Sequence, residues 1–254
     1  MDRLVYTSLG AATNQEFLRV QLVNDLANAA TFGYKRGGSV SPQTVFFEGA
    51  GFPIRAQAVV PSSVESIDLR AGSMIQTGNA LDIAMLGATV MGVQASDGTL
   101  AFTRRGDLQV NSSGVLETGN HNIVMGDGGP ITVPAGFRLT IDRAGRVMAT
   151  DPAQDIPIPQ EIGQLMLRDA STQQLQRRVD GLYTPVGVDS AEGDFPTGPV
   201  TPEVQSETIE GSNVNPVEVM VTLMDMYRSF ETQMKIIKAT EELDRDGASL
   251  ISEN

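Results

Sequence analysis

Residues 216–243, PVEVMVTLMDMYRSFETQMKIIKATEEL, carry the clearest pattern in this chain of 254 residues. Apolar side chains recur there at alternating steps of three and four: Met220, Leu223, Tyr227, Phe230, Met234 and Ile237. Apolar residues at such a and d positions predict a helix with a coiled-coil seam. Pro216 suits the first turn of this helix, and Ser212 or Asn213 could cap it.

The first thirty or so residues predict a second amphipathic helix. Leu18, Leu22 and Leu26 lie on one of its faces at steps of four. Gly33 should follow the end of this helix, with Lys35 just beyond it. A terminal helix with an apolar face needs a neighbour to cover that face. We therefore expect the two terminal helices to pair as a coiled-coil layer.

The chain between the helices predicts β structure. Phe137, Leu139 and Ile141 alternate with polar residues, and the apolar run 83–93 predicts a buried strand. Turn-forming residues recur at 96–98, 105–107, 111–114, 126–129, 142–145 and 180–181. Regularly spaced turns between short apolar segments favour a compact body of antiparallel strands.

The predicted fold class is α+β, with terminal helices around a central all-β body. We expect a discontinuous helical assembly domain at 1–35 and 211–254 and a β-rich domain at 75–183. Extended connectors should join them at 36–74 and 184–210, and the acidic second connector should be exposed.

Composition excludes several classes of function. The formal net charge of −13 argues against nucleic acids and anionic membranes as partners. The absence of cysteine excludes disulfides, thiolate metal sites and thiol nucleophiles. No apolar run approaches the roughly 20 residues that span a bilayer, so we expect no membrane insertion. The N-terminus lacks the pattern of a cleaved secretion signal.

Candidate catalytic groups are few. The single histidine, His121, lies in a polar segment that predicts an exposed turn. Residues 126–129, GDGG, precede proline-rich sequence and not a helix, so they predict a β-turn and not a phosphate-binding loop. Asp82 is expected to be partly buried and to bond turn backbone. The sequence thus predicts no catalytic site, metal, cofactor or small-molecule substrate.

Four blocks of sequence resemble the bacterial axial proteins that build the flagellar rod and hook. Residues 24–35, NDLANAATFGYK, are similar to the N-terminal signature of that family, N-x-L-A-N-x-x-T-x-G-[FY]-[KR]. Asp25 departs from it, because asparagine is more frequent there. The blocks 77–84, TGNALDIA, 103–110, TRRGDLQV, and 211–218, GSNVNPVE, also resemble family blocks.

Within this family, residues 1–7 and 128–134 resemble the proximal-rod members most, with distal-rod or other axial members as the alternative. The resemblance implies a structural subunit of the periplasmic rod that transmits motor torque. It also implies export by the flagellar apparatus without a cleaved signal. The implied partners are other rod proteins and further copies of this chain.

The same reading predicts which residues form the subunit interface: Leu18, Leu22, Leu26, Met220, Leu223, Tyr227, Phe230, Met234 and Ile237. Two other functions stay open at this point. A glycan-binding body would need an aromatic-lined groove, with Phe102, Phe137 and Tyr183 as candidates. A hydrolase would need two carboxylates placed together.

Overall fold

The computed structural model of this chain describes residues 2–38, 43–47, 56–60, 66–154, 156, 158–188 and 193–252. In the N-terminal helix it describes side chains from Gln15 onward. The chain divides into two compact units. The first consists of Met1–Ala27, Ser39–Ser63 and Asn215–Asn254, and the second of Asn28–Gly38 and Val64–Val214.

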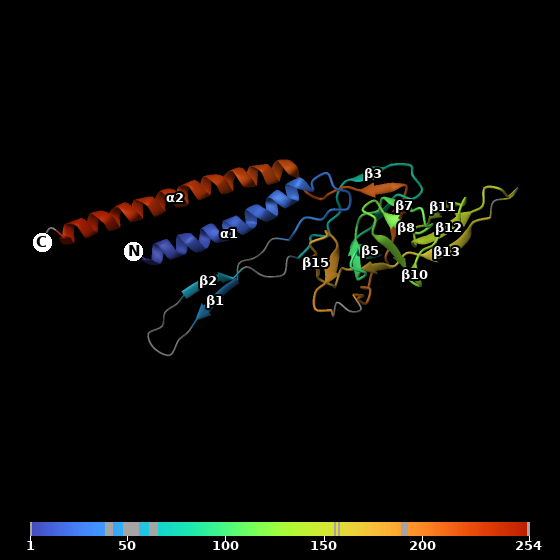
Figure 1. The fold of residues 1–254 in the computed structure, drawn as a ribbon, viewed down its shortest axis with the longest axis horizontal. Helices are drawn as coiled ribbons and strands as arrows, with labels where there is room; N and C mark the ends of the chain where they lie inside the picture. The colour runs from blue at the N-terminus through green and yellow to red at the C-terminus, as the bar shows by residue number, and fades with distance from the viewer. Residues whose placement is uncertain are drawn as a thin grey trace. The chain divides into compact units, whose positions relative to one another are not determined.

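The first unit contains the two helices and a hairpin. Helix α1 spans Asp2–Ala27 and helix α2 spans Pro216–Ser252, and the two lie side by side (Figure 1). Strands β1 (Gln43–Phe47) and β2 (Ala56–Val60) pair antiparallel. The sequence analysis expected an extended connector over these residues.

Both predicted helices are confirmed, with corrected ends. The cap of α2 is Asn215, whose side-chain oxygen accepts bonds from the N–H groups of Val217 at 3.1 Å and Glu218 at 3.4 Å. The predicted caps, Ser212 and Asn213, lie too early, because Pro216 is already the first helical residue. No helix in the described part of the chain is long and apolar enough to span a membrane.

The second unit is a body of short antiparallel strands. One sheet has the order β15-β16-β6-β5-β9-β8-β7, with β10 beside β9 and β14 beside β5. Its strands are β5 (Thr89–Gln94), β6 (Leu100–Thr103), β7 (Leu108–Val110), β8 (Leu116–Thr118), β9 (Ile123–Gly126), β10 (Gly129–Pro130), β14 (Leu167–Asp169), β15 (Leu175–Arg177) and β16 (Tyr183–Pro185).

Three smaller sheets complete this body. They are β11 (Arg138–Ile141), β12 (Arg146–Thr150) and β13 (Gln160–Gln164); β17 (Val204–Ser206) with β4 (Ile83–Met85); and β18 (Thr208–Glu210) with β3 (Met74–Gln76). The predicted α+β class, with two helices and a body of short antiparallel strands, is confirmed.

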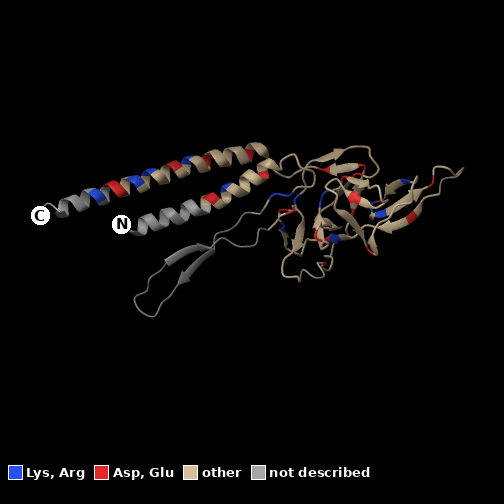
Figure 2. Ribbon diagram, in the orientation of Figure 1, with Lys and Arg blue, Asp and Glu red and all other residues tan. Residues whose placement is uncertain are grey.

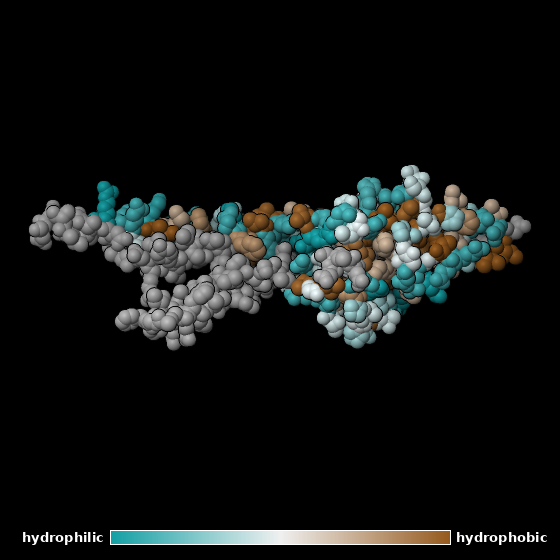
Figure 3. All heavy atoms as spheres, turned by 60° about the horizontal axis from the view of Figure 1, so that its bottom comes forward, coloured by the Kyte–Doolittle hydropathy of each residue, from teal (hydrophilic) through white to brown (hydrophobic). Residues whose placement is uncertain are grey.

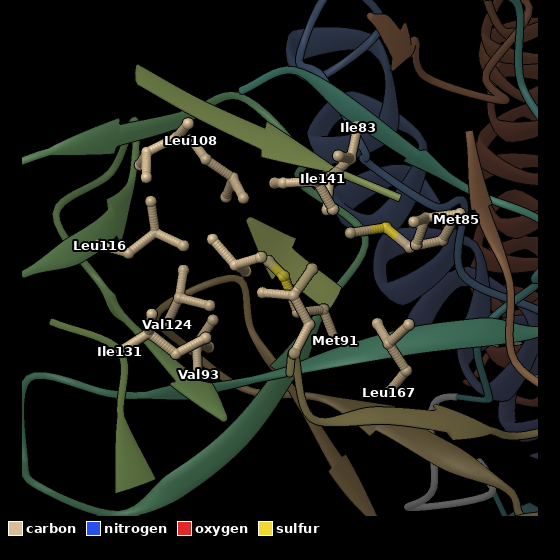
Figure 4. Packing of buried hydrophobic residues seen from close by; sticks show 14 of the residues in the cluster. Ile83, Met85, Met91, Val93, Leu108, Leu116, Val124, Ile131, Ile141 and Leu167 are labelled. Carbon is tan, nitrogen blue, oxygen red and sulfur yellow. The ribbon is translucent and has the colours of Figure 1, made fainter. Parts of the chain in front are cut away.

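The core of the body is aliphatic. Ile83, Met91, Val93, Leu116 and Val124 are fully buried and point toward one another from four different strands (Figure 4). Each such side chain stabilises the fold by roughly 1.5–3 kcal/mol. Residues 184–210 also contribute to the core, because Phe195 and Val204 are buried. The prediction that this segment is an exposed connector is therefore wrong at these residues.

Most predicted turns are present. In residues 142–145, Gly145 has a φ of 80° and its N–H bonds the carbonyl of Asp142 at 3.0 Å. The run 83–93 is two buried strands and not one, since a turn at Leu86 separates β4 from β5. Residues 105–107 form no turn. Gly106 instead lies against the backbone of Ile83, where a Cβ atom would come within 1.7 Å of the carbonyl oxygen.

Candidate functional site

The predicted interface residues divide into covered and exposed groups. Leu22 is buried, and Leu26, Leu223 and Ile237 are partly buried. The others are exposed: Leu18, Met220, Tyr227, Phe230 and Met234. Their role as a subunit interface stays a prediction.

The face of α2 that is least exposed has a different phase from the predicted seam. Its positions recur at steps of three and four, with some adjacent positions covered too: Val219, Thr222, Leu223, Met226, Ser229, Gln233, Ile237 and Thr240. The side chain of Gln15 in α1 bonds Ser229 of α2 at 2.8 Å, on this face. Four of the six predicted seam residues, Met220, Tyr227, Phe230 and Met234, thus lie outside the covered face.

The uncovered residues form an apolar stripe, which we call the outer helix face: Val217, Met220, Met224, Tyr227 and Met234. Met224 is 61% exposed and Tyr227 is 54% exposed. Hydrophobic residues reach the surface along the helix pair (Figure 3). Acidic and basic residues are interspersed along the described part of α2 (Figure 2). Large apolar side chains grouped on a surface are typical of an interaction site.

A second feature lies in the β body, where three charged side chains are completely buried. Lys35 donates a hydrogen bond to Oε1 of Glu210 at 2.6 Å, and Arg104 donates from Nε to Oε2 of the same carboxylate at 2.8 Å. Lys35 lies in the segment after α1, Arg104 directly follows β6, and Glu210 is the last residue of β18. We call them the buried ion cluster.

Backbone groups satisfy the remaining donors of this cluster. The guanidinium of Arg104 bonds the carbonyl oxygens of Gly87 at 2.6 Å, Thr89 at 3.1 Å and Met85 at 2.7 Å. Lys35 also bonds the carbonyl oxygen of Arg70 at 2.8 Å. A buried ion set is tolerated only when its members are paired and hydrogen-bonded in this way.

The chain segments next to the two helices are bonded directly to each other beside this cluster. The N–H of Gly33 donates to the carbonyl oxygen of Glu210 at 2.8 Å, and the N–H of Asn213 donates to that of Tyr34 at 3.3 Å. The side-chain oxygen of Asn213 accepts from the N–H of Arg36 at 2.7 Å. The segment that follows α1 is thereby fixed against the segment that precedes α2.

Two more side chains hold this arrangement to the body. Arg177 lies over the ring of Tyr34, with its guanidinium carbon 4.4 Å from the ring centre, and donates to the Tyr34 hydroxyl at 2.7 Å. Tyr183, which is buried, donates to the carbonyl oxygen of Gly33 at 3.3 Å. Burial raises the pKa of Tyr183 to about 12.

The buried ion cluster has two cations for one carboxylate. Burial, and then the positive charge of Arg104, lower the pKa of Lys35 to about 8. The unfolded chain should hold this proton to about pH 10.4. Between these values the unfolded state binds more protons than the folded state, so Lys35 makes stability rise with pH.

We expect the variant Lys35→Met to lose this rise. In the native chain, Lys35 should add about 3 kcal/mol to the free energy of unfolding between pH 8 and about 10.5. Tyr183 acts oppositely above pH 10, where the unfolded chain releases its proton first. Urea unfolding at several pH values should therefore give a flat curve for Lys35→Met between pH 8 and 10. A rise equal to that of the native chain would contradict the assignment.

The other sequence candidates have ordinary structural roles. The side chain of His121 is 77% exposed, as predicted, and its Nδ1 atom lies 2.7 Å from Glu117. Asp82 is buried, but it accepts bonds from the side chains of Thr77 at 2.6 Å and Asn79 at 3.0 Å, not from turn backbone.

Two of the three aromatic candidates for a glycan-binding groove are buried, and the third, Phe137, is partly buried. Phe102 is buried and packs edge to face on Phe195 at 4.8 Å, and Tyr183 is buried beside Gly33. The sequence analysis did not find the buried ion cluster. Its signal was present in part, because Lys35 and Arg104 lie inside the quoted family blocks.

Comparison with known proteins supports the resemblance. Residues 205–250 match the family model of the flagellar basal body rod FlgEFG protein C-terminal region. Residues 84–149 match the D1 domain model of the flagellar hook protein FlgE/F/G. These two matches include α2 over most of its length and much of the β body.

Full-length relatives extend the match. The chain is 33% identical over 253 residues to the flagellar basal-body rod protein FlgF of Salmonella typhimurium, covering 99% of each chain. It is 34% identical over 247 residues to FlgF of Escherichia coli, covering 95% of each. It is 30% identical over 274 residues to the rod protein FlgG of Agrobacterium fabrum, covering 100% of this chain and 99% of that one.

The two FlgF proteins match with higher identity than the FlgG protein, as the blocks 1–7 and 128–134 predicted. These relatives are structural rod proteins and not enzymes, so the predicted non-enzymatic role is confirmed. A rod protein lies in the flagellar basal body and assembles with other rod proteins. This chain belongs to the family of flagellar basal-body rod proteins.

Proposed function

We propose that this chain is a subunit of the proximal rod and joins its neighbours through the outer helix face. The observation that carries this proposal is the exposure of Met220, Tyr227 and Met234, which form half of a heptad seam. A heptad seam of apolar residues is typical of a helix with a partner on that side. The least exposed face of α2 has a different phase, which leaves Met220 and Met234 exposed. Tyr227 lies beside Arg19 of α1, yet about half of its surface is still available to a second partner.

The proposed contact is a coiled-coil layer of several helices. In it, α1 and α2 of one subunit pair with each other, and the outer helix face packs on the helices of adjacent copies or other rod proteins. Leu18 and Phe230 are exposed and would extend the contact. Rod-like assemblies use contacts in which different patches meet on successive subunits, so the outer helix face would bind a patch unlike itself.

The free energy gained by burying these side chains is large enough for a permanent assembly. Each fully buried side chain of this kind contributes roughly 1.5–3 kcal/mol. Three such side chains would strengthen each contact by about 4 kcal/mol or more, which is about a thousandfold in the association constant. Repeated contacts of this strength would let the rod carry motor torque across the periplasm.

A rod subunit must also leave the cytoplasm to reach the periplasm. We infer export by the flagellar export apparatus, because the chain belongs to the family of flagellar basal-body rod proteins. The acidic net charge of −13 supports partners other than nucleic acid or an anionic membrane. No small-molecule substrate or cofactor is part of the proposed role.

The triple variant Met220→Ser, Tyr227→Ser and Met234→Ser tests this proposal. We expect a strain that carries it in place of the native chain to export the protein normally but to build few rods. Swimming should fall to the level of a strain without the gene. The body of the variant should stay folded, because the three side chains are exposed.

The matched control is Asp225→Ser, Arg228→Ser and Lys235→Ser, which changes three exposed charged positions of the same helix. Surface charges of this kind contribute little to stability, so the control strain should swim normally. Basal bodies isolated from each strain and viewed by electron microscopy give the second measurement. Normal rods and swimming with the triple serine variant would refute the outer helix face as the contact.

A further inference from the structure

The two helices of this chain pair through a surface that repeats. The covered face of α2 returns every seven residues at Val219, Met226 and Gln233. A helix face that repeats every seven residues can meet its partner again after a shift of one heptad, and a polar or ionic group usually fixes one register. Between the helices, Gln15 bonds Ser229 at 2.8 Å, and Arg19 of α1 lies beside the Tyr227 side chain of α2.

Stronger polar contacts lie just beyond the ends of the helices. We call Gly33, Tyr34, Lys35, Glu210 and Asn213 the junction clamp. Its bonds are Gly33 to Glu210 at 2.8 Å, Asn213 to Tyr34 at 3.3 Å, and Lys35 to Glu210 at 2.6 Å. Arg104 bonds the same carboxylate, so the clamp is anchored in the core of the body.

The lengths of chain on the two sides of the clamp agree. Gly33 follows Gln15 by eighteen residues, and Ser229 follows Glu210 by nineteen residues. The numbers of residues that separate the clamp pair, Gly33 with Glu210, from the helix pair, Gln15 with Ser229, thus differ by only one between the two sides.

Little spare chain separates the clamp from either helix. After α1, the N–H of Thr31 bonds the carbonyl of Asn28 at 3.1 Å, so this segment is held in a turn. Before α2, the N–H of Val214 bonds the side chain of Ser212 at 3.2 Å, and Asn215 caps the helix. A shift of one heptad needs about 10.5 Å along the helix axis, which these bonded segments do not supply.

We propose that the junction clamp sets the register in which α1 and α2 pair. The covered apolar face supplies attraction between the helices, and the clamp selects one of the registers that this face permits. Glu210 is the positioning residue, because its carboxylate and its carbonyl oxygen both receive bonds from the segment that follows α1. This inference concerns pairing within one chain and holds whether or not the outer helix face binds a neighbour.

Thiol cross-linking of the purified full-length chain tests the register. The chain has no cysteine, so two introduced cysteines form the only possible pair. Gln15→Cys with Ser229→Cys reports the observed register, and Gln15→Cys with Thr222→Cys reports a shift of one heptad. In the otherwise native chain, we expect a short thiol cross-linker to join the first pair and to leave the second almost unjoined.

Four glycines inserted between Val214 and Asn215 should change this result. They can span about 13 Å, enough for α2 to move outward by one heptad of about 10.5 Å while the clamp stays closed. We expect the yield of the 15–222 pair to rise about tenfold, as a repeating seam permits. The same insertion after Gly98, in a turn of the body, is the control and should leave both yields unchanged.

Opening the clamp without adding length is the second arm. Glu210→Gln should also raise the yield of the 15–222 pair, whereas Glu203→Gln, in a more exposed ion pair with Arg143, should not. If Glu210→Gln prevents folding, the glycine insertion alone still tests whether the junction clamp sets the register. A 15–229 yield that persists unchanged after the insertion, with no 15–222 product, would overturn the proposal. The proposal would also be overturned if the chain with an intact clamp gave both the 15–229 and the 15–222 cross-links, or gave neither.

Discussion

Replacing Glu210 by leucine is expected to lower the free energy of unfolding of the β body by about 3–5 kcal/mol. The substitution leaves Lys35 and Arg104 buried, close together and without their carboxylate. A domain of this kind has a total stability of about 5–15 kcal/mol, so the loss approaches complete unfolding. Urea denaturation followed by circular dichroism gives the measurement.

Two further variants separate the loss of charge pairing from the loss of the side chain. Glu203→Leu removes a more exposed partner of Arg143 and should cost at most about 1 kcal/mol. Adding Lys35→Met to Glu210→Leu removes one of the unpaired cations, so the double variant should be more stable than Glu210→Leu alone. Equal stability of Glu210→Leu and Glu203→Leu would show that the buried ion cluster contributes nothing.

Gly33→Ala is expected to destabilise the body by about 3 kcal/mol. Gly33 has a φ of 68°, which costs an L-residue about 1–2 kcal/mol. A Cβ atom there would also lie 2.4 Å from the carbonyl carbon and oxygen of Arg104, and relieving such a contact typically costs 1–3 kcal/mol. Thermal unfolding should show the loss as a lower melting temperature.

Gly78→Ala is the matched control for this prediction. Gly78 has a similar φ of 73°, and a Cβ atom there would meet nothing within 4 Å. The control should therefore lose only the backbone part of the effect. If the two alanine variants were equally stable, the close approach of Gly33 to Arg104 would have no energetic role.

Local patterns predicted the elements of this fold well. Alternation at Phe137, Leu139 and Ile141 and the turn at 142–145 gave strands β11 and β12. The periodic termini gave both helices. The strands β1 and β2 were not predicted, because their segment carries prolines and no clear alternation that would mark a hairpin.

The phase of α2 illustrates what a single helix pattern can and cannot define. The most apolar seam contains Met220, Tyr227 and Met234, yet the least exposed face of α2 includes the polar residues Gln233 and Thr240. Hydrophobic periodicity identifies which faces of a helix attract partners. It does not tell which face meets a neighbour in the same chain, since both seams share Leu223 and Ile237.

The buried ion cluster could not have been predicted from local pattern. Lys35 and Glu210 are separated by 175 positions in the sequence, and charged residues are normally exposed unless paired. Arg104 directly precedes residues 105–107, which were predicted to form a turn, and its buried guanidinium bonds Glu210 and three backbone carbonyl oxygens. Only the folded topology brings the three side chains together.

The separation of Lys35 and Glu210 in the sequence also determines when the β body can finish folding. As the chain emerges from a ribosome or a narrow channel with its N-terminus leading, Lys35 has no carboxylate to meet until Glu210 arrives. Closing so long a loop is slow and entropically unfavourable. The segment around Lys35 therefore cannot complete its native contacts until more than four-fifths of the polypeptide has emerged. Folding of the β body should finish only after that point.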